Sequence, residues 1–279
     1  MKRTALLLAA LLLTLTTALG APSDTTAVRI ISYNIRLGTG NDGSNRWELR
    51  RHASVNMILS ESPTAIGIQE ALADQLEYLL DSLPDYDMVG VGRDDGLSRG
   101  EHMAILYNTT EVELLNWGTF WLSPTPTEPS FGWDSACKRT CTWARFRHLT
   151  TGKQFMMLNT HLDHKGAVAQ HEGVRLIAHH IKQQLPLGIP IFLTGDMNIT
   201  PDAAPLRQLD GTLHDARTSS PEGDPRGTFN RWGRADRIID YIFFRHAVPV
   251  RYAVLRDKDY GAPFISDHYP ILFEAKLPQ

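Results

Sequence analysis

The segment Ile191-Phe192-Leu193-Thr194-Gly195-Asp196-Met197-Asn198 has the form that decides the fold, a short apolar run closed by acid and amide side chains. Short apolar runs of this kind fill the interior of a sheet. A carboxylate at the end of such a run is held at the sheet rim, where open α/β sheets place their sites. Three further segments end in the same way, namely Ile30-Ile31-Ser32-Tyr33-Asn34, Ala65-Ile66-Gly67-Ile68-Gln69-Glu70 and Ser266-Asp267-His268. Converging oxygen ligands make a pocket for Mg²⁺ or a similar cation, so the pattern predicts a metal-assisted hydrolase.

Strand-like and helical segments alternate through the 279 residues, and the strands outnumber the helices. Apolar periodicity predicts helices over 47–59, 71–83 and 167–185, and a short helix over 202–209. The predicted strands are 28–34, 65–69, 87–91, 103–107, 111–116, 142–147, 154–160, 190–195, 238–244, 249–255 and 271–275. Two sheets packed face to face with helices outside would bury these runs, which predicts an α/β fold. The stretch 117–143 is rich in proline and aromatic residues, and we predict a long ordered loop over the site.

The N-terminus has the pattern of a secretory signal, with Lys2 and Arg3 before an apolar run over 5–19 and small residues up to Gly20. An uncleaved membrane anchor is the alternative, but the run is short for a span of roughly 20 residues. We therefore expect residues 1–20 to be removed and residues 21–279 to form a single domain. The protein is then expected to be secreted or periplasmic and monomeric, with no transmembrane segment in the mature chain.

The charge balance limits the classes of partner. Residues 1–20 hold two of the 28 basic residues and none of the 31 acidic ones, so without them the net charge is −5. Such a protein lacks the broad basic surface of a tight, non-specific nucleic-acid binder. A nuclease that takes its substrate only at a metal-bearing cleft is still allowed.

Cys137 and Cys141 are the two cysteines of the chain. In an exported protein they can be oxidised, and we expect a disulfide across the short loop between them, with free thiols as the alternative. A zinc site would need four ligands, and no second cysteine pair exists.

Two of the strand-end segments carry acidic residues whose role has two possible interpretations. Glu70 either binds a metal or caps a helix that starts at Ala71, since acids favour helix N-termini. Asp196 and Asn198 are two residues apart, so both side chains can face one side of an extended segment. There, one can orient a water while the other holds a phosphate oxygen or a metal. The alternative is an ordinary turn, in which Asp and Asn are common.

Histidines supply a second group of candidates. His161-Leu162-Asp163-His164 follows an apolar strand, and two histidines with an acid in four residues favour function over a purely structural role. Asp240 stands inside the apolar run 238–244, where an unpaired acid is costly to bury, so we expect it to pair with His268. Glu101 is a weaker candidate to orient His161 in the same way.

Together these segments resemble the endonuclease/exonuclease/phosphatase superfamily of metal-dependent phosphodiesterases, over about residues 28–276. The motifs that carry the resemblance occur in the family order, as Ser32-Tyr33-Asn34, Ile68-Gln69-Glu70, Asn159-Thr160-His161, Gly195-Asp196-Met197-Asn198, Ile239-Asp240-Tyr241 and Ser266-Asp267-His268. Further segments resemble a bacterial branch on the deadenylase side, among them Asn34-Ile35-Arg36-Leu37-Gly38, Gly132-Trp133-Asp134 and Thr142-Trp143-Ala144. The chain departs from that branch at Gln170, where the branch commonly has Arg.

The resemblance implies a four-layer α/β sandwich with two mixed β-sheets and the site at one rim. It implies Glu70 as the principal metal ligand, with Asn34 and Asp267 beside it, and Mg²⁺ as the cation, with Mn²⁺ or Ca²⁺ as alternatives. Asp196 would orient or deprotonate the attacking water, and Asn198 would position phosphate. The implied chemistry is in-line displacement at phosphorus.

The resemblance also assigns charge stabilisation on the phosphoryl oxygens to His161 and to His268, the latter paired with Asp240. The candidates for substrate contact are Arg139, which matches a basic residue of the branch, together with Trp133, Asp163 and His164. The expected partner is a phosphate ester, either a diester or a monoester. Extracellular nucleic acid, a phospholipid head group and a sugar phosphate are all open. The aromatics near Trp47, Trp121, Trp133 and Trp143 can stack on bases or sugars or serve packing alone.

Two other classes compete with this interpretation. A calcineurin-like dinuclear phosphatase also places Asp, Asn and His at strand ends, but it requires Asp-x-His on its first strand, where this chain has Tyr33-Asn34-Ile35. A binding module could keep the fold and have lost the reaction, although all six motif positions are intact.

Overall fold

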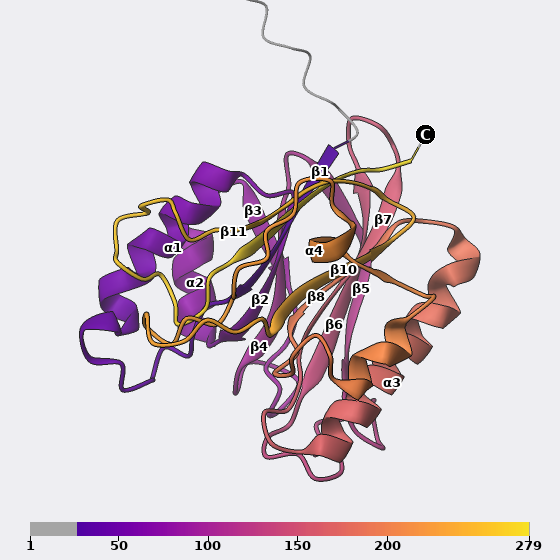
Figure 1. Cartoon of the computed structure of the whole chain (residues 1–279), viewed down its shortest axis with the longest axis horizontal. Helices are drawn as coiled ribbons and strands as arrows, with labels where there is room; N and C mark the ends of the chain where they lie inside the picture. Colours follow the sequence, from indigo (N-terminus) through magenta and orange to yellow (C-terminus); the bar gives the residue numbers. More distant parts are fainter. Residues whose placement is uncertain (1–26, 279) are drawn as a thin grey trace, which may run out of the picture.

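The computed structural model describes residues 27–278, and two mixed β-sheets form its centre (Figure 1). One sheet has the order β11-β12-β1-β2-β4-β3, and the other has the order β5-β6-β7-β8-β10-β9. The strands of the first sheet are β1 (Ala27–Asn34), β2 (Ala65–Ala71), β3 (Tyr86–Val89), β4 (His102–Asn108), β11 (Val248–Val254) and β12 (Ile271–Lys276). Those of the second are β5 (Val112–Trp121), β6 (Thr140–His148), β7 (Gln154–His161), β8 (Ile191–Asp196), β9 (His214–Asp215) and β10 (Asp240–Arg245).

The helices cover the outer faces of the two sheets, so the expected four-layer α/β sandwich is confirmed (Figure 1). Helices α1 (Trp47–Glu61) and α2 (Ala73–Ser82) pack on the first sheet, and α3 (Ala167–Gln184) packs on the second with the 3-10 helix η3 (Ala204–Leu209). The shorter elements are η1 (Gly43–Asn45), η2 (Leu185–Leu187) and α4 (Ala216–Ser219). A third apolar cluster fills the space between the sheets, with Phe146, Phe155, Phe192 and Phe273 at its centre.

The strand directions explain where a site can form. In each sheet of the described residues one pair of strands is parallel, β1 with β2 and β7 with β8, while the other pairings are antiparallel. These two parallel pairs also contact each other across the sandwich. Their carboxyl ends therefore open at one common rim, where four of the acid- and amide-bearing segments arrive.

A polar layer joins the two sheets just behind that rim. Gln69 Nε2 donates to Asn159 Oδ1 (2.7 Å), and Thr194 Oγ1 donates to the same oxygen (3.1 Å). The sheets approach closely here because Gly67 lacks a side chain: a Cβ at this position would lie 2.1 Å from Thr194 Oγ1. Buried hydrogen bonds between the two sheets fix their relative position, which holds the strand ends in register.

Three sequence predictions need correction. The helix expected over 71–83 begins at Ala73, because Ala71 still belongs to β2, and so the cap proposed for Glu70 does not exist. The loop expected over 117–143 is shorter, because β5 and β6 pair from Val112 with His148 as far as Trp121 with Thr140. Proline first breaks the pattern at Pro124, so only residues 122–139 form the loop.

The disulfide prediction is also wrong, since Cys137 and Cys141 are both free. Cys141 lies in β6 and is buried in the apolar cluster under α3, whereas Cys137 lines the pocket at the rim. Burial raises the pKa of the Cys141 thiol, which favours its neutral form.

The predicted signal segment falls outside the described residues. Within residues 27–278, none of the helices has both the length and the apolar character that crossing a bilayer would require.

Candidate active site

The site lies at the rim where β1, β2, β7 and β8 end and β10 begins. Strand register brings the segments together: Asn34 is opposite Gln69, and Asp196 lies between His161 on one side and Asp240 on the other. These residues are tens to hundreds of positions apart in the chain, so the alignment is a property of the sheets.

A pocket of about 340 Å³ opens at this rim. Eight of the predicted site residues line it, namely Glu70, Arg139, His161, His164, Asp196, Asn198, Asp267 and His268. Asn34 and Asp240 stand directly behind its wall, bonded to residues that line it. A larger groove of about 740 Å³ beside β11 contains no predicted site residue, and most of its charged side chains pair with one another.

Glu70 is held at the base of the pocket by a β-bulge. The pairing of β2 with β4 is interrupted after Ile68, and Glu70 has a φ of +64°, a left-handed conformation that turns its side chain out of the strand alternation. Its carboxylate accepts hydrogen bonds from Asn34 Nδ2 (3.0 Å) and from the backbone N–H of Leu37 (3.0 Å). Burial alone would raise the pKa of Glu70, but these bonds and the charges of His268 and Arg36 outweigh it, so its pKa is lowered and it stays ionised.

Asn34 links two carboxylates. Its amide nitrogen also donates to Asp196 Oδ2 (3.0 Å), and its Oδ1 accepts from the backbone N–H of Arg36 (3.0 Å). The donor end of the side chain therefore faces Glu70 and Asp196.

His268 and Asp240 form the pair that the sequence predicted. His268 Nδ1 lies 2.8 Å and 3.1 Å from the two Asp240 oxygens, and Thr228 Oγ1 donates to the same carboxylate (2.5 Å). Burial acts to lower the pKa of His268, but the charges of Asp240 and Asp196 overcome it and raise the pKa to about 10. His268 is thus an imidazolium at neutral pH, with Nε2 3.7 Å from Asp196 Oδ2.

At Asp196, in contrast, burial outweighs the effect of the neighbouring positive charge on the pKa. Burial and the neighbouring charge of Asp240 raise its pKa to about 7, although His268 and a hydrogen bond from the backbone N–H of Asn198 (2.9 Å) act against the rise. A carboxylate that titrates near neutrality can accept a proton from water at working pH.

His161 is neutral and its tautomer can be inferred. Asn198 Nδ2 donates to the Leu162 carbonyl (3.0 Å), which identifies it as the amide nitrogen, and it also lies 2.9 Å from His161 Nε2. Nε2 is therefore the acceptor and Nδ1 carries the proton. Burial and the charge of Arg139 lower the pKa of His161 well below its ordinary value, and the buried Nδ1 has no hydrogen-bond partner.

The suggestion that Glu101 orients His161 is wrong. Glu101 bonds instead to Arg93 (2.6 Å), and both side chains are largely buried. Arg93 lies on a loop that precedes β4, and nothing in the sequence linked it to Glu101.

Arg139 lines the pocket and has unused N–H donors. It is buried, its Nη2 lies 3.1 Å from His164 Nδ1, and its Nε is 3.5 Å from Asp163 Oδ2. Its Nε and Nη1 make no hydrogen bond. A buried guanidinium in this state is costly unless a ligand completes it.

Asp163 serves the loops that build the pocket wall. Its Oδ1 accepts from the backbone N–H groups of Lys165 and Gly166, and its Oδ2 accepts from those of Ala136 and Cys137. It is 1% exposed and does not line the pocket, so direct substrate contact is not supported.

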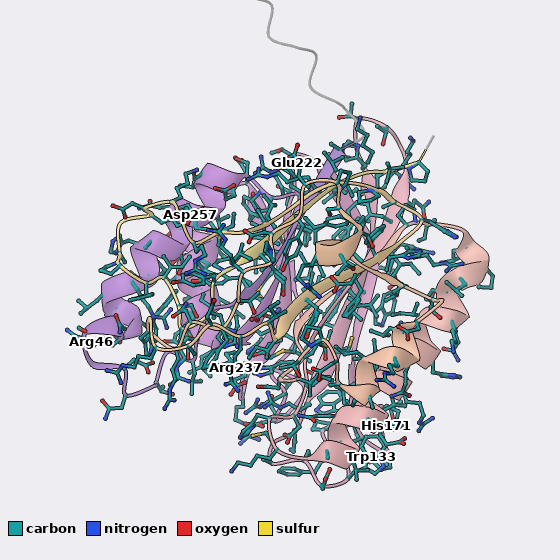
Figure 2. The ribbon with its side chains drawn as sticks, in the orientation of Figure 1. Arg46, Trp133, His171, Glu222, Arg237 and Asp257 are labelled. Carbon is teal, nitrogen blue, oxygen red and sulfur yellow. The ribbon has the colours of Figure 1, made fainter. Side chains whose placement is uncertain are left out.

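Trp133 also lies outside the pocket, near the start of α3 (Figure 2). The next residue, Asp134, accepts from the backbone N–H groups of Ala169 (2.7 Å) and Val168 (3.3 Å). It thereby caps α3, whose own N-cap Gly166 has no side chain for the task. The segment of Trp133 and Asp134 thus anchors loop 122–139 to α3, and the substrate role predicted for Trp133 stays a prediction.

The lining residues that the sequence analysis did not single out as candidates include three with side chains suited to ligand contact: Arg36, Phe229 and Arg237. Arg36 follows Asn34 by two residues, and Asp42 holds its guanidinium with two 3.0 Å bonds. Position near a motif was the available signal for Arg36 and for Arg237, which precedes Asp240 by three residues. Phe229 had no such signal.

The side chains fit a divalent cation. One ligand atom each of Glu70, His161 and Asp196 lie within 4.8 Å of one another, and Asp267 lines the same pocket. Burial, together with the charges of Asp240 and Glu70, raises the pKa of Asp196, and a divalent cation would offset the repulsion among these carboxylates. A second cluster, Cys137 with Asp163 and His164, fits a metal less well because four backbone N–H groups already occupy the carboxylate.

Comparison with known proteins gives a consistent result. A sequence model described as the endonuclease/exonuclease/phosphatase family matches residues 31–268. A solved member of that family from Bacteroides thetaiotaomicron is 34% identical with a TM-score of 0.84, covering 90% of this chain and 98% of that one. A mannosyl-6-phosphatase from the same organism is 33% identical with a TM-score of 0.84, covering 89% and 99%. The human Nocturnin catalytic domain shares the fold at 18% identity and a TM-score of 0.70, covering 91% and 95%.

Proposed function

Because this chain belongs to the endonuclease/exonuclease/phosphatase family, whose members are hydrolases of phosphate esters, we propose that it is an exported, Mg²⁺-dependent phosphoesterase. The observation that carries the proposal is the single pocket in which acids, an imidazolium and a buried guanidinium with unused N–H donors meet. Carboxylates are suitable ligands for a hard cation, and the cationic side chains are suitable donors to a phosphate. The pocket therefore has groups for both the metal ion and the phosphoryl group.

Glu70 and Asp267 would hold the cation, and Asn34, expected from the sequence as a further ligand, instead donates its amide N–H to Glu70 and fixes that carboxylate. When bound, Mg²⁺ supplies charge neutralisation at the phosphoryl oxygens and assists departure of the leaving oxygen. No thiolate is part of this set, which agrees with a hard cation such as Mg²⁺.

Asp196 is the proposed base for the attacking water. Its pKa of about 7 leaves it partly ionised at neutral pH and still basic enough to accept a proton. Asn34 and the backbone N–H of Asn198 fix the two carboxylate oxygens, so the group is aimed before substrate arrives.

Three donors are proposed for the phosphoryl oxygens. His268 offers its Nε2 proton, Arg139 offers its free Nη1, and neutral His161 offers its unpartnered Nδ1 proton. Donors that are placed before the reaction stabilise charge as it develops, which is commonly the largest catalytic contribution. Asn198 orients His161 through Nε2.

For the substrate we propose a sugar phosphate, on the basis of 33% identity with the mannosyl-6-phosphatase over nearly the whole of both chains. Nucleic acid is the second candidate from the sequence, but the acidic net charge does not favour it.

The test is hydrolysis of 4-nitrophenyl phosphate and bis(4-nitrophenyl) phosphate by the purified protein, with Mg²⁺ and with chelator. We expect Asp196→Ala and His268→Ala to abolish turnover without loss of fold by circular dichroism, while the exposed control Asp202→Ala retains it. Wild-type rates in either active-site variant would contradict the assignment. Absence of hydrolysis across monoesters, diesters and sugar phosphates would favour a binding module, and a stably held Zn or Fe pair would favour the calcineurin-like class.

Export is proposed from the N-terminal sequence alone. N-terminal sequencing of the protein recovered outside the cytoplasm should begin close to residue 21. An intact Met1 in that fraction would contradict cleavage.

A further inference from the structure

A short hairpin over residues 228–237 borders the pocket. Its two ends pair through backbone bonds between Phe229 and Arg237, and its tip carries Arg231 and Arg234. The backbone N–H groups of Asn230 and Arg231 donate to the carbonyl of Asp267 (2.8 and 3.0 Å), and Asn230 Nδ2 donates to the carbonyl of Ser266. The hairpin is therefore fixed directly to the segment that carries Asp267 and His268.

Among the described residues, the three arginines of this hairpin have no acidic side chain paired with them. Arg231, Arg234 and Arg237 are exposed, and none makes an ion pair in the described structure. The one acid of the hairpin, Asp236, forms an ion pair with Arg256 (3.2 Å) and accepts a hydrogen bond from the backbone N–H of Gly227 (3.1 Å). In a protein of negative net charge, this leaves a local excess of positive charge beside the pocket.

Arg237 is the member that reaches the pocket. Its guanidinium carbon lies 5.1 Å from the centroid of the Phe229 ring, and that ring lies 4.9 Å from the ring of His268. Stacking uses the face of the guanidinium and leaves its N–H edge available for an anion. In the view of Figure 2, Arg237 lies toward the lower end of the sandwich, while Glu222 lies toward the upper end.

We propose that Arg237, supported by Arg231 and Arg234, binds a second anionic group on the alcohol part of the substrate, and so selects phosphate esters that carry another carboxylate or phosphate. This inference rests on the proposed phosphoesterase function and names the class of substrate for the same pocket. The phosphoryl group itself is left to the deeper donors, since Arg139 is buried and Arg237 is exposed. Arg237 is accordingly a specificity-determining residue.

The test compares two probes that share a 6-phosphate, glucose 6-phosphate and 6-phosphogluconate, of which the second adds a carboxylate. Calorimetric titration is carried out with Mg²⁺ on full-length Asp196→Ala, which should not hydrolyse the probes, and the variants below are made in the same protein. It should show tighter binding of 6-phosphogluconate by about five-fold, roughly the effect of one exposed charge-assisted contact. Arg237→Gln should reduce that preference to less than two-fold and leave the affinity for glucose 6-phosphate nearly unchanged. The preference should also shrink when NaCl is raised from 50 to about 300 mM, because exposed charges are screened.

Arg51→Gln is the matched control, because Arg51 is likewise exposed and stacked on an aromatic ring, that of Tyr78 (4.4 Å), but on α1 and outside the pocket. It should keep the full preference. Equal binding of the two probes by the Asp196→Ala protein, or an unchanged preference when Arg237→Gln is added to it, would overturn the inference. Because binding is measured apart from turnover, a protein that hydrolyses no ester fails the proposed function alone, and a hydrolase without the preference fails this inference alone.

Discussion

Replacing Asp240 with Asn should disable the site through His268. The substitution keeps size and removes one charge from a buried pair 2.8 Å apart, in which Asp240 is 2% exposed and His268 is 4% exposed. Burial then dominates at His268, and its pKa should fall from about 10 to 6.5 or below. At about 1.36 kcal/mol for each pKa unit, a fall from 10 to 6.5 corresponds to about 5 kcal/mol. Asp196, 3.7 Å from Nε2, retains part of the stabilisation.

Two measurements follow from that change. Loss of one charged donor at the phosphoryl group should reduce kcat by about 10²–10³. Because the folded-state pKa of His268 is raised, its stabilising contribution is fully present below pH 6.5 and is lost as the pH rises through 10. The difference in free energy of unfolding between the wild type and Asp240→Asn, measured in urea, should therefore shrink steadily from pH 6.5 to pH 10.

The assay is an NMR titration of the His268 ring in both proteins, together with initial rates on 4-nitrophenyl phosphate. Asp236→Asn is the control, because that carboxylate is 65% exposed and pairs with Arg256 at the surface. It should change the free energy of unfolding by less than about 1 kcal/mol. A His268 that still titrates above pH 9 in Asp240→Asn, or a kcat within three-fold of wild type, would refute the reasoning.

The other predictions concern the supports of the site. Gly67→Ala should lower the free energy of unfolding by about 1–3 kcal/mol, since its Cβ would clash with Thr194 Oγ1; urea unfolding at wild-type stability would contradict this. Asp134→Ala should lower it by about 1 kcal/mol, because α3 loses its cap, and should speed limited proteolysis within loop 122–139; unchanged cleavage would argue against the anchor. Mg²⁺ at a hundred times its Kd should raise the free energy of unfolding by about 2.7 kcal/mol, and Glu70→Gln should remove most of that gain; an equal gain in the variant would place the ion elsewhere.

Much of the site could be predicted because its polar and charged residues lie within or directly after apolar strand segments, where burying them without a partner is unfavourable. Asp240 inside an apolar strand required a partner, and the expected His268 is that partner. Glu70 was correctly placed at a strand end, but its bulge and positive φ leave no mark in a sequence in which Gln69 and Ala71 flank it. The Cys137–Cys141 bridge was wrong because strand alternation sends Cys141 into the core, whereas spacing along the chain suggested proximity.

The sequence by itself determined the strands, the helices and the acid, amide and imidazole groups that end them, because periodicity and desolvation act locally on each segment. Only the tertiary structure decided which groups touch. The pairing of Glu101 with Arg93, the use of Asp163 and Asp134 as loop anchors, and the approach of Arg237 to the pocket all depend on strand register and loop path. Strand register and loop path depend on packing over the whole sandwich, which brings each side chain next to residues that are distant in the sequence.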